Sequence, residues 1–514
     1  MPRSWYVLDT IYLMILIGAT RVSYRLIRLR RQNRTFPWSK RKKVMIIGGG
    51  EAGRSLITEI QNSKYLDQKV VCIIDDDPYK IGRYIKGVKV VGNRNSIKKS
   101  VKKYNVQQII LTIPSANAAK IRPIVEICQD TNCELMILPG VYQLVNGEVK
   151  ASKLCPVNID DLLGRDEVHV NLNEVMDYVS GRVIMVTGGG GSIGSELCRQ
   201  IAKHSPKQLI IFDIYENNAY DIQQELLREQ PKLDLVVLIG SVRDENRINS
   251  IFEQYRPEII YHAAAHKHVP LMEGSPNEAI KNNVLGTYNM VRMADKWNAK
   301  RFVQISTDKA VNPTNIMGAS KRICEMIIQT YNKESNTEYV AVRFGNVLGS
   351  NGSVIPLFKK QIAEGGPVTV THPEIIRYFM TIPEAVSLVL QAGAYAKGGE
   401  IFVLDMGEPV KILDLARNMI RLSGYKVDQD IKIEFTGLRP GEKLYEELLM
   451  DEEGMTDTPN KLIHIGHPID VDEVKLAHAL RVLESAAQNE TDDMRLIVES
   501  IVPTYHPKLN KSTQ

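Results

Sequence analysis

Two stretches of the chain share one pattern of apolar and polar positions. In each, a short run of Val, Ile and Met leads into a glycine-rich turn, and a helical pattern follows. The first run is Val44–Ile47, and the second, Val183–Thr187, comes about 140 residues later. Short apolar runs that alternate with helical patterns are typical of buried strands in a parallel sheet. The pattern therefore predicts an α/β fold with two Rossmann-like, doubly wound parallel sheets.

The remaining apolar runs give the expected domain organisation. A first domain is expected over residues 41–140, with further strands at 70–75, 89–91, 108–112 and 135–138. A connector, 141–180, leads to a second domain over residues 181–505, with further strands at 209–213, 235–238, 259–262, 302–306 and 339–344. After about residue 350 the alternation loosens and Pro and Gly become frequent, which predicts a C-terminal substrate-binding lobe. The last 20 or so residues show no clear pattern and are expected to form a loose end.

The first 34 residues follow another pattern. Trp5 to Thr20 is apolar except for Asp9 and the hydroxyl-bearing side chains, and an arginine-rich stretch follows from Arg21 to Arg34. This apolar run of roughly 16 residues is short for a spanning helix, which needs about 20, but snorkelling arginines extend it. We therefore expect a membrane helix within residues 1–34, with the arginines and the rest of the chain on the cytoplasmic side. An amphipathic helix lying in the membrane interface is the alternative.

Composition narrows the class of protein. The chain has 514 residues, 44% hydrophobic and 24% charged, which is typical of a folded protein rather than a disordered one. A net charge of +5 and an aromatic content of 6% argue against a nucleic-acid partner. The six cysteines include no Cys-x-x-Cys pair, and several lie in apolar runs. We therefore expect buried free thiols and no metal site.

The second glycine-rich turn has the pattern of a dinucleotide site. Gly188, Gly191 and Gly194 follow the strand, and Asp213 ends the next strand. Glycines let the backbone approach a pyrophosphate at the helix N-terminus, and the acidic residue accepts hydrogen bonds from the ribose hydroxyls. Because Asp213 would repel a 2′-phosphate, the pattern favours NAD over NADP.

The first domain repeats this layout with Gly48, Gly50, Gly53 and Asp75. No residue downstream of this turn supplies catalytic chemistry. We therefore favour a structural or regulatory role for this domain, and whether it binds any nucleotide stays open.

Two further segments follow the fifth strand of the second domain, Ser306-Thr307-Asp308-Lys309 and Met317-Gly318-Ala319-Ser320-Lys321. Together with the turn at 187–194, they resemble the extended short-chain dehydrogenases/reductases. More closely, the chain resembles the membrane-associated nucleotide-sugar 4,6-dehydratases of bacterial polysaccharide and glycan assembly, the CapD-like group. The resemblance covers nearly the whole chain, including segments 162–165, 262–270 and 438–443.

Two features depart from the superfamily. Met317 stands where most short-chain dehydrogenases carry the tyrosine of Tyr-x-x-x-Lys, and a thioether cannot take a proton from a sugar hydroxyl. The same methionine marks a dehydratase subgroup that the resemblance implies is active. Family members usually have about four membrane helices, and this chain begins with what looks like the last one.

The resemblance implies a reaction on a UDP-N-acetylglucosamine type of substrate. C4 is oxidised by NAD⁺, water is lost across C5 and C6, and the hydride returns to C6 to give a 4-keto-6-deoxy sugar nucleotide. Asp308 would act as the acid at the C6 hydroxyl and Lys309 as the base at C5. Burial favours the uncharged form of both groups, whereas their mutual attraction opposes it. Thr307 would hydrogen-bond the C4 oxygen, and we expect the C4 hydroxyl proton to pass through Thr307 or a water to Lys321.

Other roles carry over from the resemblance. The expected cofactor contacts are Gly188, Gly191, Ser192, Ile193, Gly194, Asp213, Asp244, Ala263, Ala264, Asn283 and Lys321. The expected substrate contacts are Asn346, Arg377 and Arg439. His266 and His268 either point into the site or are structural. The resemblance also implies attachment to the bacterial inner membrane, and a homo-oligomer is expected by analogy with the fold.

Two other functions stay open. A nucleotide-sugar epimerase on the same fold would need the missing tyrosine and has no use for an acid–base pair at C5 and C6, so Met317 and Asp308-Lys309 favour dehydration. A non-catalytic, NAD-binding scaffold of a polysaccharide assembly is the second alternative, and Met317 is the feature that supports it. The exact sugar and the configuration at C5 also stay open.

Overall fold

A computed structural model of the chain describes residues 4–32, 41–63, 67–114, 116, 118–129, 131, 133–138, 155–156, 176–447, 454–466 and 471–506. The chain divides into two compact units, residues 1–164 and 165–514, and each is described by itself. The predicted connector 141–180 lies outside the described residues, apart from 155–156 and 176–180, and so does segment 162–165.

The first unit contains a mainly parallel sheet in the order β3-β4-β2-β1-β5-β6-β7. Only the edge strands β3 and β7 pair antiparallel with their neighbours. The strands are β1 (Lys42–Ile47), β2 (Gln68–Ile74), β3 (Tyr84–Ile85), β4 (Val88–Gly92), β5 (Gln108–Leu111), β6 (Glu134–Ile137) and β7 (Cys155–Pro156). The helices are α2 (Glu51–Asn62), η2 (Arg94–Ser96), α3 (Ile97–Tyr104) and α4 (Ala118–Gln129). A Rossmann-like sheet was predicted for this part of the chain, and the structure has one.

The N-terminal stretch forms one helix, α1 (Ser4–Gln32). Asp9 and the arginines from Arg21 onward interrupt its apolar character. None of the helices in the described part of the chain is both long and apolar enough to cross a membrane. The predicted spanning helix is therefore not supported.

The second unit is built on a larger sheet in the order β10-β9-β8-β11-β12-β13-β18-β22-β21. The strands from β10 to β18 in this order pair parallel with one another. β22 pairs antiparallel with both of its neighbours, β18 and β21. The strands are β8 (Val183–Thr187), β9 (Gln208–Asp213), β10 (Leu235–Ile239), β11 (Ile259–His262), β12 (Arg301–Ile305), β13 (Glu338–Arg343), β18 (Ile401–Leu404), β21 (Met455–Asp457) and β22 (Ile463–Gly466). The strand order reverses at β8, which lies between β9 and β11, and ligands of doubly wound sheets bind at such a reversal.

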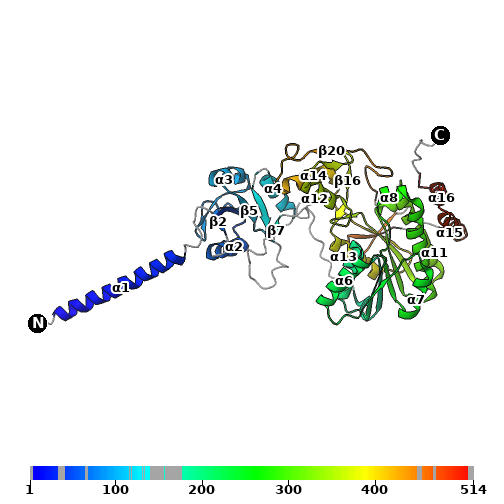
Figure 1. Ribbon diagram of the computed structural model, residues 1–514, viewed down its shortest axis with the longest axis horizontal. Helices are drawn as coiled ribbons and strands as arrows, with labels where there is room; N and C mark the ends of the chain where they lie inside the picture. The colour runs from blue at the N-terminus through cyan, green and yellow to red at the C-terminus, as the bar shows by residue number, and fades with distance from the viewer. Residues whose placement is uncertain are drawn as a thin grey trace. The chain divides into compact units, whose positions relative to one another are not determined.

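Helices cover both faces of this sheet. They are η7 (Met176–Tyr178), α5 (Ser192–Ala202), α6 (Glu216–Glu229), α7 (Glu245–Tyr255), α8 (Val269–Gly274), α9 (Pro276–Ala279), the π-helix η8 (Ile280–Leu285), α10 (Gly286–Lys296), η9 (Asp308–Ala310), α11 (Ile316–Glu334), α13 (Ile382–Tyr395), α15 (Glu473–Gln488) and α16 (Met494–Ile501). Figure 1 shows α7 and α11 on one side of the sheet and α6 and α13 on the other.

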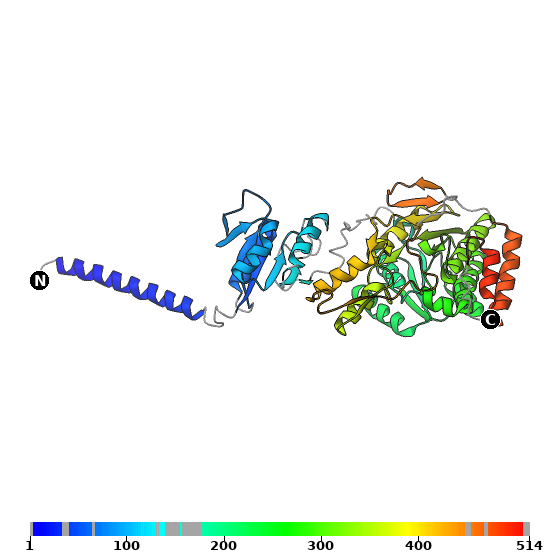
Figure 2. The same cartoon turned by 90° about the horizontal axis from the view of Figure 1, so that it is seen from above.

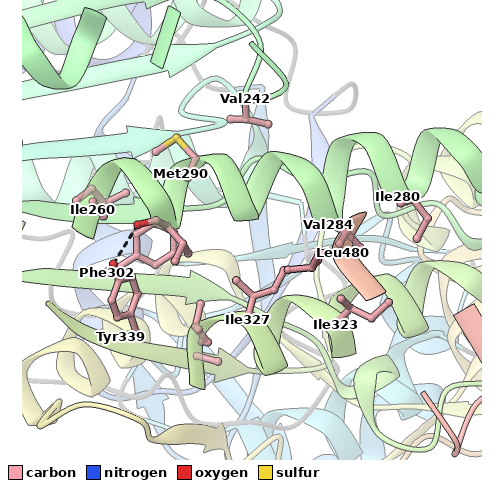
Figure 3. Packing of buried hydrophobic residues seen from close by; sticks show 14 of the residues in the cluster. Val242, Ile260, Ile280, Val284, Met290, Phe302, Ile323, Ile327, Tyr339 and Leu480 are labelled. Atoms are coloured by element: carbon pink, nitrogen blue, oxygen red, sulfur yellow. Dashed lines mark hydrogen bonds between the residues drawn. The ribbon is translucent and has the colours of Figure 1, made fainter. Parts of the chain in front are cut away.

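Alternate residues of each strand feed two separate apolar cores. In β8, Val183 and Met185 join the core under α7, α10 and α11, whereas Ile184 and Val186 join the core under α5 and α13. Figure 3 shows the first of these cores, in which Leu480 of α15 lies beside Val284 of η8 and close to Ile323 of α11. Because both faces are covered, the strands are apolar throughout, which is why the sequence shows continuous runs instead of alternation.

The expected lobe follows β13 and consists of short elements outside the main sheet. They are β14 (Asn346–Val347), α12 (Val354–Ala363), β15 (Val368–Val370), β16 (Ile376–Arg377), β17 (Phe379–Met380), β19 (Val410–Lys411), α14 (Ile412–Leu422) and β20 (Ile433–Phe435). They pair as β14 with β17, β15 with β20 and β16 with β19.

The prediction of a loose C-terminal end is wrong for residues up to 506. Figure 2 shows α15 and α16 side by side, in orange and red. Met494, Val498 and Tyr505 are fully buried in the core that includes α11. The apolar residues of this stretch form only a short pattern near the end of the chain. The helix that they pack against, α11, lies far away in sequence, so the pattern alone does not predict an ordered end. The predicted buried thiols are confirmed at Cys72, Cys128, Cys198 and Cys324, which are free and buried.

Candidate active site

The glycine-rich turn after β8 brings backbone close to the start of α5. Gly188 has a φ of +65°, and a Cβ there would lie 2.8 Å from the backbone nitrogen of Ala264. A Cβ on Gly194 would lie 2.1 Å from the carbonyl oxygen of Gly188. Only glycine fits at both positions. The start of α5 has no side-chain cap, so its first N–H groups are available to an anionic ligand.

Asp213 is held rigidly at the end of the neighbouring strand β9. Its Oδ2 accepts a hydrogen bond from the backbone N–H of Gly190 at 2.8 Å, and its Oδ1 accepts one from that of Tyr215 at 2.8 Å. Each carboxylate oxygen retains capacity for another donor, such as a ribose hydroxyl. The turn, the helix start and Asp213 thus form a dinucleotide site of the kind that binds NAD.

The loop after β11 completes this edge of the sheet. Ala263 and Ala264 lie in it, opposite Gly188. Asn283 lies in the π-helix η8, where its side chain accepts from the His266 N–H at 2.8 Å and donates to the His266 carbonyl at 3.0 Å and to the Ser320 hydroxyl at 2.9 Å. Asn283 therefore fixes the loop against α11. A π-helical turn is often found at functional sites.

The other predicted residues of this edge have diverse surroundings. Ser192 and Ile193 form the first turn of α5. Asp244 is exposed and caps α7, because its carboxylate accepts from the Arg247 N–H at 3.0 Å. His266 lies 3.3 Å from the Arg243 guanidinium, measured from Nε2. These contacts neither require nor exclude the predicted ligand contacts, which stay predictions.

The catalytic segment begins directly after β12. The Lys309 ammonium donates to Asp308 Oδ1 at 2.9 Å, and the Thr307 hydroxyl donates to the same oxygen at 2.8 Å. Asp308 is 1% exposed, and its Oδ2 has no hydrogen-bond partner among the described residues. A Cβ on Gly345 would lie 3.1 Å from this Oδ2, so glycine keeps the space beside the free carboxylate oxygen open.

Glu446 is a second buried carboxylate at this site, and the sequence analysis missed it. Its Oε1 lies 3.9 Å from Lys309 Nζ and 3.7 Å from Arg377 Nε. Its Oε2 is buried without a hydrogen-bond partner among the described residues. Burial raises the pKa of Glu446. Glu446 lies more than a hundred residues from Lys309 in sequence, and the only signal was its place just after the recognised segment 438–443.

Two opposing effects act on Lys309. Burial lowers its pKa, but the carboxylates of Asp308 and Glu446 raise it, and the net direction is upward. The expected attraction of Asp308 thus opposes burial, and Glu446 adds a second attraction in the same direction. Together the two carboxylates favour the ammonium form of Lys309.

Lys321 and Met317 lie on α11 beneath the catalytic segment. The Lys321 ammonium donates to the Ile305 carbonyl at 2.9 Å, and burial lowers the pKa of this lysine. Met317 is 3% exposed and belongs to the apolar core. The methionine thus fills a dry position and offers no group for proton transfer.

A cavity of about 370 Å³ lies between the catalytic segment and the lobe, a size typical of small-molecule sites. It is lined by Lys309 and Glu446 and by all three predicted substrate residues, Asn346, Arg377 and Arg439. His268 also lines it, whereas its neighbour His262 is buried and neutral, since burial lowers its pKa to about 3. The structure therefore brings residues from η9, β14, β16 and the segment 438–446 into one pocket.

Arg377 and Arg439 differ in how free they are to bind a phosphate. The Arg377 guanidinium donates to the carbonyls of Ile376 at 2.7 Å, Lys443 at 2.7 Å and Leu444 at 3.2 Å. Most of its donors therefore hold the segment that carries Glu446. Arg439 is exposed at the rim, 3.5 Å from Glu442. Of the two, Arg439 is the better candidate for a phosphate contact.

A buried ion-pair network supports the floor of the site. Arg343 of β13 makes two 2.7 Å hydrogen bonds to Glu325 of α11, and the Ser306 hydroxyl donates to the same carboxylate at 2.7 Å. Arg322 adds a 2.9 Å contact. Burial opposes ionisation, but the neighbouring arginines lower the pKa of Glu325 to about 2. This network fixes the ends of β12 and β13, which Thr307 and Asn346 follow in the chain.

Known proteins resemble this chain over most of its length. Residues 184–468 match the model of a family described as polysaccharide biosynthesis protein, and residues 3–139 match that of a CoA-binding domain. Capsular polysaccharide biosynthesis protein CapD of Staphylococcus aureus is 49% identical over 443 residues, which cover 86% of this chain and 73% of that protein. UDP-glucose 4-epimerase of Rickettsia bellii is 36% identical over 279 residues, which cover 53% of this chain and 79% of that protein.

Among solved structures, Pen from Bacillus thuringiensis is 34% identical, with a TM-score of 0.53. The match covers 58% of this chain and 90% of that chain.

The doubly wound sheet and the glycine turn with Asp213 define a dinucleotide-binding protein with a Rossmann-type fold. With the family match over more than half of its length, the chain belongs to the polysaccharide biosynthesis protein family.

Proposed function

We propose that this chain is a 4,6-dehydratase of a UDP-N-acetylhexosamine, with UDP-N-acetylglucosamine as the substrate and a 4-keto-6-deoxy sugar nucleotide as the product. The main observation behind this proposal is the buried Asp308–Lys309 pair, with Glu446 close to Lys309. These acid–base groups lie beside a cavity large enough for a sugar. The names of the capsule protein and of the UDP-sugar epimerase among its relatives support a nucleotide sugar as the substrate class.

The residues around the second glycine turn fit NAD. Gly188, Gly191 and Gly194 would receive its pyrophosphate and Asp213 its adenosine ribose, and the Asp213 charge disfavours a 2′-phosphate. Bound there, NAD⁺ would supply the hydride acceptor for oxidation at C4 and the hydride donor for reduction at C6. The chain itself supplies binding, orientation and proton transfer.

The Asp308–Lys309 pair holds the proton that elimination needs. The ion pair and the neutral pair, a carboxylic acid beside an amine, contain the same number of protons, and 2.9 Å separates the two atoms that exchange one. In the neutral form, Lys309 Nζ takes the C5 proton while Asp308 gives its proton to the departing C6 hydroxyl, which leaves as water. This leaves the pair as carboxylate and ammonium, and Lys309 gives the proton back to C5 when the hydride is returned at C6.

The proton of the C4 hydroxyl needs another acceptor because Met317 has none. Lys321 has a pKa lowered by burial, which makes its neutral form more accessible than that of an exposed lysine. We assign it this proton, carried through the Thr307 hydroxyl or a water. Asn346 and Arg439 also line the cavity and would contact the nucleotide diphosphate.

An epimerase is the second candidate, favoured by the relationship to the UDP-glucose 4-epimerase of Rickettsia bellii. C4 epimerisation needs reversible proton transfer at the C4 oxygen alone. It gives no role to a buried acid–base pair with a free carboxylate oxygen, so the dehydratase accounts for more of the site.

Mass spectrometry of UDP-N-acetylglucosamine after incubation with the purified full chain and NAD distinguishes these functions. We expect a product lighter than the substrate by one water molecule, with no net consumption of NAD. A product of unchanged mass but inverted C4 would indicate the epimerase. No conversion by a chain that binds NAD would contradict both.

We also propose that α1 attaches the chain to the inner face of a bacterial cytoplasmic membrane by lying in the interface. Its apolar side chains from Ile11 to Ile17 are exposed, and Arg21 and Arg25 follow. Such a helix binds anionic bilayers through both features. The full chain should co-sediment with vesicles containing phosphatidylglycerol, and Leu16→Asp should weaken this. Equal sedimentation of the two proteins, or none of either, would contradict the attachment.

A further inference from the structure

The first unit has a large cavity of its own that the proposed reaction does not use. Its volume is about 610 Å³, and it opens at the carboxyl edge of the sheet between the glycine turn, the end of β2 and the end of β5. Its lining includes Gly50, Glu51, Asp75, Lys80 and Arg94. This volume lies within the range of small-molecule sites.

The turn beside this cavity resembles the turn in the second unit, although it is one residue shorter between its first glycine and the helix cap. Gly48 has a φ of +104°, and a Cβ on Gly53 would lie 2.1 Å from the Gly48 carbonyl oxygen. A Cβ on Gly194 would lie at the same distance, 2.1 Å, from the Gly188 carbonyl oxygen. Gly50, which caps α2, has a φ of −74°, and so does Gly191, which caps α5. The two turns therefore leave equivalent room for a phosphate.

The acidic residue is also held in the same way. Asp75 ends β2, and its Oδ2 accepts from the Gly49 N–H at 2.7 Å while its Oδ1 accepts from the Asp77 N–H at 2.9 Å. Asp213 accepts from its glycine turn and from the residue two positions on with nearly the same distances. The ribose-binding half of a dinucleotide site is thus repeated in the first unit.

We propose that this cavity binds a nucleotide through an adenosine diphosphate moiety with unphosphorylated ribose hydroxyls, as in ADP or NAD. Such a ligand would place its ribose on Asp75 and its diphosphate at the start of α2. Lys80 and Arg94 are also at this edge, but Lys80 pairs with Asp75 at 3.1 Å and Arg94 pairs with Asp76 at 2.7 Å. A ribose phosphate would meet these carboxylates, which disfavours CoA and NADP.

At the end of β5, which pairs with β1 as β11 pairs with β8, the described lining residues are Thr112, Ile113, Pro114 and Ala116. The Thr112 hydroxyl donates to the Gly48 carbonyl at 2.7 Å and so holds the glycine turn against this strand end. These groups form the wall of the cavity beside the glycine turn.

Gly50 allows this site to be blocked without disturbing the backbone. Its φ is negative, and a Cβ there would meet no atom within 4 Å, so Gly50→Asp adds a carboxylate that points into open space beside the helix start. Gly274→Asp is a matched control, since a Cβ at Gly274 also meets nothing within 4 Å and the residue lines neither cavity described here. Gly191→Asp blocks the second unit.

Equilibrium dialysis of the full chain with radiolabelled NAD tests the proposal. We expect about two equivalents on the unaltered chain and on Gly274→Asp, and about one on Gly50→Asp and on Gly191→Asp. One equivalent on the unaltered chain, or two on Gly50→Asp, would overturn it. In the Gly191→Asp chain, ADP should displace NAD better than CoA does, and the opposite order would overturn the unphosphorylated ribose.

Glu51 supplies a variant whose expected effect cannot arise from misfolding. It occupies the first position of α2, where the second unit has Ser192, and its negative charge opposes a diphosphate. Glu51→Ser should tighten NAD binding in the Gly191→Asp chain by about two- to fivefold. Unchanged affinity would contradict the placement of the diphosphate at α2. These measurements do not depend on the proposed dehydratase activity.

Discussion

At the scale of single residues, the chemistry depends on the number of protons held by three neighbouring groups. Asp308 and Glu446 flank Lys309, so the lysine keeps its proton although it is buried. Elimination needs that proton on Asp308. Glu446 does not touch a reacting atom in this account, and it acts as a positioning residue that sets how readily Lys309 releases the proton.

Glu446→Gln should therefore shift the pH dependence of kcat. The Glu446 charge raises the pKa of Lys309, so its removal lowers that pKa, and the pair loses its shared proton at a lower pH. The alkaline limb of the kcat profile should move to lower pH. Glu447→Gln is the matched control, since Glu447 is about half exposed and pairs with Lys443. An alkaline limb that stays in place in Glu446→Gln would contradict this role.

At the scale of elements, β13 and α11 are held together by one buried network. Glu325 joins Arg343, Arg322 and Ser306, and these contacts position the strand ends that carry the catalytic segment. Removal of one partner from a buried ion pair leaves an uncompensated charge, which is the main cost of such a change.

Glu325→Gln should lower the stability of the second unit by about 3–5 kcal/mol. The pKa of Glu325 falls to about 2 on folding, so its contribution is complete above the pKa of the unfolded carboxyl and is lost as the pH falls through about 2. Urea unfolding at several pH values measures both effects. Glu334→Gln, at the exposed end of α11, is the control. A Glu325→Gln protein with unchanged stability near neutral pH would show that the network is dispensable.

Most of the elements that the sequence predicted well are buried strands. The strands β8, β9, β11, β12 and β13 are buried because helices cover both faces, and this leaves a continuous apolar run in the sequence. The strands of the lobe are two to three residues long, and their pairing partners lie many residues away, so no local pattern marks them. The C-terminal helices were not predicted because they are stabilised by packing against α11 and not by a strong pattern in their own residues.

At the scale of the whole molecule, local patterns marked the site residues that adjoin a strand end, and the family resemblance supplied the others, such as Arg439. Thr307, Asp308 and Lys309 follow β12 directly, and Asp213 ends β9. Glu446 reaches the site through the tertiary fold of the segment held by Arg377, and Arg377 itself was predicted as a phosphate ligand although most of its donors hold that segment. Roles that depend on long-range contacts require the structure.

The duplication of the nucleotide-binding turn is also a property of the whole molecule. Both units hold an aspartate against a glycine turn with matching hydrogen bonds. In the second unit the Asp308–Lys309 pair follows another strand end of the same sheet.

Proton NMR of UDP-N-acetylglucosamine incubated with the full chain in deuterated water tests the dehydratase account most directly. We expect a new 6-methyl signal and no net consumption of NAD, because the C4 hydride returns to C6. We also expect deuterium at C5, because Lys309 exchanges the C5 proton with solvent. Asp308→Asn should reduce the rate by about two orders of magnitude or more. A sugar that keeps its C6 hydroxyl and changes only at C4 would contradict the account.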